Sequence, residues 1–492
     1  MDCINIHHPA KETDMLFNSF EFLLFFPLVV TVYFLQPFKA RKFFLLAASL
    51  YFYMSFIPKY IMILGFTTVV DYTAAFFIDK FKDRKNLKKA VFITGVLLNV
   101  GLLVTFKYLG VIGDTINFFG KMISLKTVVL PELILPIGIS FHTFQSMGYL
   151  IDVYKGTAPA EKNFFNFALF LMFFPQLVAG PIERTSNLMG QLKEKHYLKA
   201  ENVSFGGRMM LYGMFKKIVV ADSLAIVADR VFNNVEKFGG WGLVFGVLCF
   251  TIQIYCDFSG YSDIAIGCAK IMDINLMKNF DTPYFSASVP EFWRRWHISL
   301  STWFKDYVYI PLGGNRVSKP RWVFNQLVTF TVSGVWHGAG YTYVVWGFLN
   351  GVYIVVSRFV KPVKEKIAKI LRVGNKPYIT KPFSVLITFI LISFSWIFFR
   401  ANTFSDAFYI IKNIFGASFV DFGDISAFRI GVCVGAVILL MTIEGIMSYG
   451  KRAVSLFNRA PHFTRVICYG IMVAIILIFG SFGENQFIYF QF

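Results

Sequence analysis

The sequence predicts an all-α membrane protein that crosses the bilayer many times. Hydrophobic residues make up 56% of the 492 residues, charged residues only 16%, and the mean hydropathy is +0.58. This composition lies outside the range of soluble globular domains. Apolar stretches of nearly spanning length recur along the whole chain, and we expect roughly ten to twelve of them to form membrane helices, with interfacial helices between them.

The net charge of +19 is concentrated in short connections between apolar stretches. Two of these connections are residues 80–89 and 361–372, and each carries several lysine and arginine residues. Because cytoplasmic loops of membrane proteins carry such an excess, we assign both connections to the cytoplasm. The same distribution argues against nucleic acid as a partner, since a nucleic-acid protein gathers its basic residues on one face.

The N-terminal residues 1–14 are polar, and Met15 then opens an apolar stretch at 17–35. We expect a polar leader over 1–14, with Met15 as an alternative start of translation, and a single membrane domain over 15–492. The stretch at 17–35 is too long for a removable signal peptide and lacks a small-residue cleavage site, so it should stay as an anchor. The cysteines form no C-x-x-C pair, and we expect neither a disulfide nor a metal site.

Two apolar stretches in the first half of the chain are interrupted by proline and glycine. The interruptions are LPIG at 135–138 and FPQLVAGP at 174–181. Irregular backbone at membrane depth is tolerated only where it is buried in protein or lines a cavity. The middle of the chain should therefore surround a cavity.

His337 lies at the end of an apolar, helical stretch that begins at Trp322. An ionisable group at membrane depth is costly, which favours a functional role over that of a hydrogen-bonded structural histidine. Ser333 is one helical turn earlier on the same face, and Gly334 and Gly338 would let a substrate or a second backbone come close. Imidazole, with a pKa of about 6.5, suits a base that takes a hydroxyl proton during acyl transfer, and histidine can also carry an acyl group.

Residues 291–307 are expected to form one amphipathic helix in the membrane interface. Trp293 lies on its aromatic face, Arg294 and Arg295 lie on its polar face, and His297 lies at the edge between them. The arginines could meet the phosphates of a coenzyme or a carrier arm that brings the acyl group. A simple lipid-interface anchor remains the alternative.

Other polar residues give weaker signals. Asp257 and Asp263 follow an apolar stretch and could orient a histidine or bind a cation, or they could cap a helix break. His142 is expected to be a structural histidine, with a cavity-lining role as the alternative. His196 has polar, basic neighbours and is expected to be solvated. The motifs of serine hydrolases, zinc proteases and P-loop proteins are absent from the sequence.

Taken in order, six motifs resemble the membrane-bound O-acyltransferase (MBOAT) family, in particular its branch in bacterial alginate and polysaccharide O-acetylation. The resemblance covers nearly the whole chain from Met15. The motifs are LPIGISF at 135–141, FPQLVAGPI at 174–182, DFSGYSD at 257–263, EFWRRWHISLS at 291–301, YIPLGG at 309–314 and VWHGA at 335–339.

The resemblance implies a ring of tilted helices around a central funnel in the bacterial plasma membrane. An acyl group would pass from a cytoplasmic donor, acetyl-CoA or another acyl thioester, across the bilayer to a periplasmic or extracellular acetyltransferase and its polysaccharide acceptor. No tightly bound cofactor is implied. The matching catalytic residues are His337 and His297, and we place substrate contacts at Trp293, Arg294, Arg295, Ser333 and Trp336.

Two alternatives remain at this point. The same fold could transfer D-alanine to teichoic acid, although YIPLGG at 309–314 and the length of the chain favour the alginate-like branch. A polysaccharide transporter without chemistry is the other alternative. Transporters often show repeated halves with paired broken helices, and the sequence shows neither feature.

Overall fold

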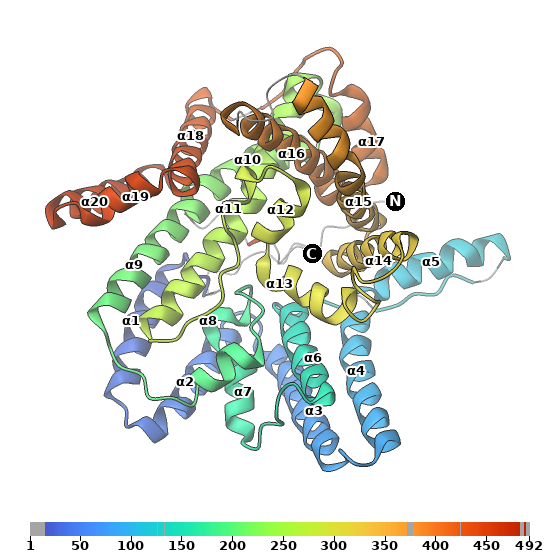
Figure 1. The fold of residues 1–492 in the computed structure, drawn as a ribbon, viewed down its shortest axis with the longest axis vertical. Coiled ribbons are helices and arrows are strands. Elements are labelled where there is room, and N and C mark those ends of the chain that lie inside the picture. The colour runs from blue at the N-terminus through green and yellow to red at the C-terminus, as the bar shows by residue number, and fades with distance from the viewer. Residues whose placement is uncertain are drawn as a thin grey trace.

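The computed structural model describes residues 15–492 except 125, 132, 371–376, 424, 483–486 and 489–492, and these residues form helices and connecting loops (Figure 1). Within them there is no strand, only an isolated bridge between Gly239 and Phe419. The predicted all-α class is confirmed. The predicted leader at 1–14 lies outside the described residues.

The first half of the chain contributes α1 (Phe20–Leu35), α2 (Phe38–Met54), η1 (Pro58–Tyr60), α3 (Ile61–Lys80), α4 (Lys85–Lys107), α5 (Leu109–Met122), α6 (Ile139–Lys155), α7 (Phe164–Met172), α8 (Phe174–Leu177), η2 (Thr185–Met189), α9 (Ala200–Met214), η3 (Phe215–Ala221), α10 (Asp222–Phe232) and η4 (Val235–Lys237). The second half contributes α11 (Trp241–Ile271), η5 (Pro283–Phe285), α12 (Val289–Arg295), α13 (Ile298–Phe304), η6 (Lys305–Tyr309), α14 (Lys319–His337), α15 (Tyr341–Ile370), α16 (Pro377–Arg400), α17 (Phe404–Asn413), α18 (Ala427–Tyr449), α19 (Lys451–Arg459) and α20 (His462–Phe479).

Seven helices among the described residues are long and apolar enough to cross a membrane, and they belong to α3, α4, α11, α15, α16, α18 and α20. This finding confirms a multi-pass membrane protein. Other apolar stretches of the sequence are divided into shorter pieces. The stretch at 164–179 becomes α7 and α8, and the stretch at 208–228 becomes parts of α9, η3 and α10.

The helices surround the short helices α12 and α13, which lie near the middle of the molecule, while α5 and α20 project outward on opposite sides (Figure 1). The long helix α11 is largely buried and packs along α9. Glycines allow this close approach, because a Cβ atom on Gly206 would lie 2.5 Å from the carbonyl oxygen of Gly267, and one on Gly213 would lie 2.6 Å from that of Gly260.

The two proline-glycine interruptions, which the sequence predicts to lie at a cavity, meet in space. Gly138 has a φ of +74°, and a Cβ atom there would lie 2.7 Å from the carbonyl oxygen of Leu177. A residue without a Cβ is therefore needed where the start of α6 passes the end of α8. Both interruptions line one small cavity, through residues 135–138 and Val178.

Candidate active site

His337 is the last residue of α14 and is buried, with 4% of its surface exposed. Its ring packs edge-on against Trp346 of α15, at a centroid distance of 5.0 Å. Gly334 was expected to let a substrate or a second backbone come close. It is the backbone of α15 that approaches, since a Cβ atom on Gly334 would lie 2.2 Å from the carbonyl oxygen of Tyr343. Close packing of α14 on α15 thus fixes the helix that carries His337.

The end of α4 holds the carbonyl groups at the end of α14. Lys107 donates from Nζ to the carbonyl oxygens of Trp336 (2.6 Å) and His337 (2.9 Å), and the Tyr108 hydroxyl donates to that of Val335 (2.5 Å). The last carbonyls of a helix have no partner within the helix, and a cation is favoured at this end of the helix dipole. We call these three contacts the α4–α14 clamp.

His297 does not lie within one interfacial helix, so the prediction of a continuous helix over 291–307 is wrong. α12 ends at Arg295, Trp296 is extended, and His297 has a φ of +41° before α13 begins at Ile298. This left-handed conformation is uncommon outside glycine and is associated with functional sites. The break turns the His297 side chain inward, where 1% of its surface is exposed.

Asn279 orients the His297 ring. The Asn279 Oδ1 atom lies 3.1 Å from His297 Nδ1 and also accepts a hydrogen bond from the Ser299 hydroxyl (2.9 Å). Because an amide oxygen can only accept, Nδ1 carries the ring proton and Nε2 carries the lone pair. Burial lowers the pKa of His297 to about 3, so the ring is neutral near pH 7.

Both histidines line one cavity of about 460 Å³. The cavity runs along one face of α14, from Gln326 through Thr329 and Ser333 to His337, a distance of about 16 Å for a helix that rises 1.5 Å per residue. The wall opposite includes Trp293, Arg294, Ser301, Thr302, Lys305 and Tyr309. The cavity has room for an elongated ligand with a polar end.

A second, smaller cavity of about 30 Å³ also reaches His337. Its walls include Lys107, Trp336 and the residues of the two interruptions. A space of this size holds one or two water-sized groups. His337 is thus shared by two cavities, one extended along α14 and one beside the end of α4.

The structure brings together most of the expected site residues. The large cavity is lined by His297, His337, Trp293, Arg294 and Ser333. The buried Nε1 of Trp293 has no hydrogen-bond partner in the part of the chain that the structure describes, so it can serve as a donor. Trp336 lines the small cavity instead. Arg295 lines neither of these cavities and pairs with Glu291 at 2.7 Å within α12.

Asp257 and Asp263 do not mark a helix break, because α11 continues through both of them. Asp257 pairs with Lys217 at 2.7 Å, and Asp263 pairs with Lys216 at 2.5 Å. Lysine side chains of η3 therefore take the place of the suggested cation. Within the described ranges, no group of histidine, cysteine and acidic side chains could hold a metal ion.

His142 was expected to be a structural histidine, and its surroundings agree with this role. It is buried, and its Nε2 lies 2.7 Å from the Thr67 hydroxyl oxygen, a contact between α6 and α3. Neither cavity at His337 has His142 in its wall. This histidine helps to join two helices.

Comparison with known proteins identifies the class of protein. The profile of the membrane-bound O-acyltransferase family, MBOAT, matches residues 157–399, which include His297 and His337. The chain belongs to this family and is an O-acyltransferase.

Several relatives cover most of the chain. It is 37% identical to the probable alginate O-acetylase AlgI of Pseudomonas aeruginosa over 404 residues, 82% of this chain and 75% of that protein. It is 36% identical to the peptidoglycan O-acetyltransferase of Helicobacter pylori over 436 residues, 82% of this chain and 80% of that protein. The teichoic acid D-alanyltransferase of Bacillus subtilis is 26% identical over 293 residues, 56% of this chain and 70% of that protein.

Lys107 and Asn279 were missed by sequence reasoning. Lys107 precedes His337 by 230 residues, and nothing around it separates it from other lysines at helix ends. Asn279 lies in a loop that has no recognised motif. Only the fold brings these residues to the histidines that they position.

Removal of the lysine from the clamp should lower the transfer activity. In Lys107→Met two buried carbonyls lose their donor, and we expect about 10- to 100-fold lower acyl transfer per amount of folded protein, because small shifts of a reacting group are costly. Activity and amount of protein are measured on the same membranes. Lys121→Met, a change of an exposed lysine at the end of α5, is the control. Wild-type activity of Lys107→Met would show that the clamp does not position His337.

Proposed function

We propose that this protein takes an acetyl group from a cytoplasmic acyl thioester, such as acetyl-CoA, and passes it across the bacterial plasma membrane for O-acetylation of a cell-surface or secreted polysaccharide. The observation that carries the proposal is the position of His337 in the walls of two cavities. The names of the alginate O-acetylase and the peptidoglycan O-acetyltransferase support acetate as the group and a glycan as the acceptor.

The direction of transfer follows from the charge of the connections. α4 starts beside the basic connection 80–89, and its other end, at Lys107, contacts the end of α14. If the basic connections face the cytoplasm, the end of α4 at Lys107 and the end of α14 at His337 are the ends farther from the cytoplasm. The large cavity then leads from the cytoplasmic side to His337, and the small cavity lies beyond it.

The two histidines would have different tasks in this reaction. A hydroxyl group that enters from the small cavity attacks the thioester carbonyl carbon while the His337 imidazole takes the hydroxyl proton. The carbon–sulfur bond breaks, and the proton passes to the leaving thiolate. The hydroxyl belongs to the polysaccharide or to a partner acetyltransferase on the outer side. His297 lines the donor cavity and holds the thioester.

The remaining expected residues would bind the donor. Arg294 is exposed and lines the cavity, so it can meet the phosphates of a coenzyme or a carrier arm. The indole N–H group of Trp293 and the hydroxyl of Ser333 can donate to the acyl carbonyl. Trp336 would shape the acceptor side. Arg295 would act through its pair with Glu291, which fastens α12.

A deletion strain tests the function directly. We expect loss of ester-linked acetate from the surface polymers and unchanged polymer export, measured by mass spectrometry of the isolated polymers. Loss of D-alanine with retention of acetate would instead support D-alanyl transfer, the activity named for the relative in Bacillus subtilis. Loss of polymer export would contradict transfer chemistry and favour a transporter. Complementation with the intact gene is the control.

A further inference from the structure

A third cavity, of about 380 Å³, lies at the start of α2, between α7 and the segment 192–196. No residue of either cavity at His337 lines it. Its charged lining is mostly basic and includes Lys39, Arg41, Lys42 and Lys193. Among the described residues, Glu194 is the one acidic residue in this lining.

The basic side chains leave positive charge in this cavity. Among the described residues, Lys39, Arg41 and Lys42 form no ion pair, whereas Lys193 pairs with Glu161. Lys42 Nζ donates to the side-chain amide oxygen of Asn166 at 3.3 Å and lies 5.1 Å from the centroid of the Phe43 ring, and neither group carries a net charge. Three lysine and arginine charges thus face one carboxylate, Glu194, in the wall of the cavity.

Arg41 is held by backbone oxygens that do not neutralise it. Its guanidinium donates to the carbonyl oxygens of His196 (2.7 Å), Gln36 (3.1 Å) and Phe34 (3.2 Å). These contacts use three of the five N–H donors and hold the group in place, but carbonyl groups carry no net charge. An anion in the cavity would supply the missing charge.

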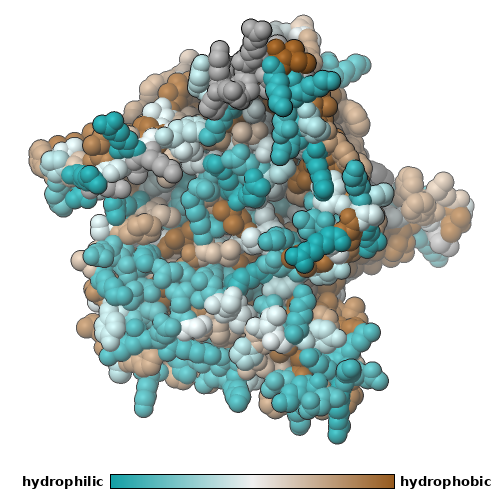
Figure 2. Space-filling model, in the orientation of Figure 1, coloured by the Kyte–Doolittle hydropathy of each residue, from teal (hydrophilic) through white to brown (hydrophobic). Residues whose placement is uncertain are grey.

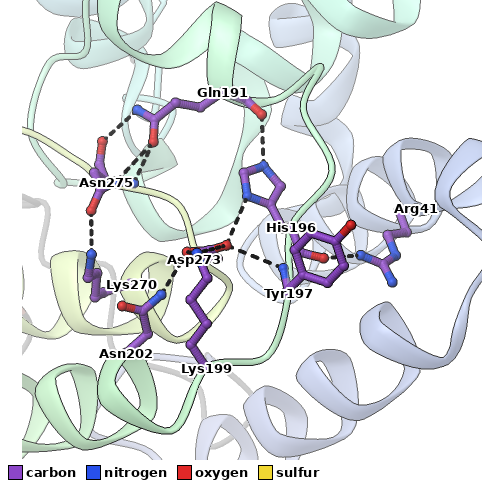
Figure 3. Close-up of polar contacts among 9 residues, drawn as sticks. All are labelled: Arg41, Gln191, His196, Tyr197, Lys199, Asn202, Lys270, Asp273 and Asn275. Carbon is purple, nitrogen blue, oxygen red and sulfur yellow. Dashed lines mark hydrogen bonds and ion pairs between the residues drawn. The ribbon is translucent and has the colours of Figure 1, made fainter.

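The wall at 192–196 is rigidly supported (Figure 3). His196, expected to be solvated, is buried, and its Nε2 lies 2.8 Å from the carbonyl oxygen of Gln191, so that expectation is wrong. Its Nδ1 lies 3.9 Å from a carboxylate oxygen of Asp273. Burial alone would raise the pKa of Asp273, but contacts that include hydrogen bonds from Lys199 and Asn202 hold it below its usual value. These contacts support the segment 192–196.

Besides the charged residues and the polar residues Asn166 and His196, the lining is apolar. The apolar part consists of Tyr33, Phe38, Phe43, Leu45, Leu169, Leu192 and Ile274. Phe38 and Phe43 are exposed, at 44% and 46%. Hydrophilic residues cover much of the lower part of the face shown in Figure 2, where α2 and α7 lie in Figure 1. A cavity lined by both cations and apolar side chains suits an amphiphile better than a soluble ion.

We place the start of α2 on the same side of the membrane as the connection 80–89. α2 and α3 are consecutive helices joined by the short segment 55–60, and so the start of α2 and the end of α3 share a side. By the charge of 80–89 this is the cytoplasmic side, where anionic phospholipids attract basic residues near the surface.

We propose that this cavity binds the phosphate group of an anionic membrane phospholipid. Lys39 and Lys42 contact the phosphate, Arg41 contributes a fixed charge, and the apolar lining contacts the first part of an acyl chain. The site is separate from acyl transfer, and it attaches the wall at 192–196 to the membrane surface.

Native mass spectrometry of the purified full chain in detergent tests this proposal, with phosphatidylglycerol and phosphatidylcholine as the added lipids. We expect phosphatidylglycerol to be retained preferentially. The variant Lys39→Gln with Lys42→Gln should retain about 30-fold less, about fivefold for each lysine. The matched control, Lys82→Gln with Lys85→Gln, removes two exposed lysines outside the cavity and should behave as wild type.

Three results would overturn the proposal. The first is that the cavity variant retains as much phosphatidylglycerol as the wild type, and the second is that the wild type binds both lipids equally. The third is displacement of phosphatidylglycerol by equimolar inorganic phosphate or coenzyme A, which would make a soluble phosphate the ligand. The melting temperature without lipid shows whether each variant is folded. If the double variant is unfolded, Lys39→Gln alone, at an exposed position, should still lose about fivefold.

Discussion

Replacement of His337 by alanine is expected to remove acyl transfer almost completely. A positioned general base contributes about 10²- to 10⁴-fold to such a reaction, and no other histidine in the part of the chain that the structure describes lies in the walls of both cavities. Ester-linked acetate on the surface polymers should fall by this factor. The measurement is mass spectrometry of polymers from cells that produce His337→Ala in the deletion strain.

The amount of folded protein must be measured beside the activity. Fluorescence-detected size-exclusion chromatography of detergent extracts gives this amount, and His462→Ala, at an exposed position at the start of α20, is the matched control. If His337→Ala accumulated normally and acetylated the polymer at the wild-type rate, the catalytic role proposed for His337 would be wrong.

Replacement of Lys217 by methionine is expected to have the largest effect on stability. Its ammonium group lies 2.8 Å from Asp222 and 2.7 Å from Asp257, and the three side chains are buried. Without the lysine, two buried carboxylates lose their counter-charge, a change that costs about 3–5 kcal/mol for a buried ion pair. Since proteins are stable by only about 5–15 kcal/mol, this loss is a large part of the total, and both the yield and the melting temperature should fall.

This prediction is checked by the yield and melting temperature of the extracted protein. Lys412→Met, which changes an exposed lysine at the end of α17, should leave both unchanged. A triple variant with Lys217→Met, Asp222→Asn and Asp257→Asn restores neutrality and should recover part of the yield. Normal stability of Lys217→Met would show that the buried charges are balanced in another way.

The sequence predicted those features that depend on local composition. Apolar length and basic connections gave the membrane class, and proline-glycine interruptions gave a cavity near residues 135–138. The spacing of Ser333 and His337 placed both on one face of a helix, and both line the same cavity. Helical periodicity and hydropathy act over a few turns, which is why these inferences needed no knowledge of the fold.

The inferences that failed depended on long-range packing. A helical pattern ran through 291–307, but Asn279 and the surrounding aromatic rings hold His297 in a left-handed conformation that divides the helix. His196 has polar neighbours in the sequence, and the fold nevertheless buries it against Gln191 and Asp273. A residue's neighbours in the chain do not determine its tertiary partners.

The hydrogen bonds of the α4–α14 clamp go only to backbone atoms of α14, and this affects which substitutions related proteins can tolerate. Lys107 and Tyr108 bind carbonyl oxygens of residues 335–337 and not their side chains. A substitution at Trp336, which lines the small cavity, can therefore change the shape of that cavity while the backbone that carries His337 keeps its position. Under the proposed mechanism, acceptor preference can change during evolution while the residues that hold His337 stay the same.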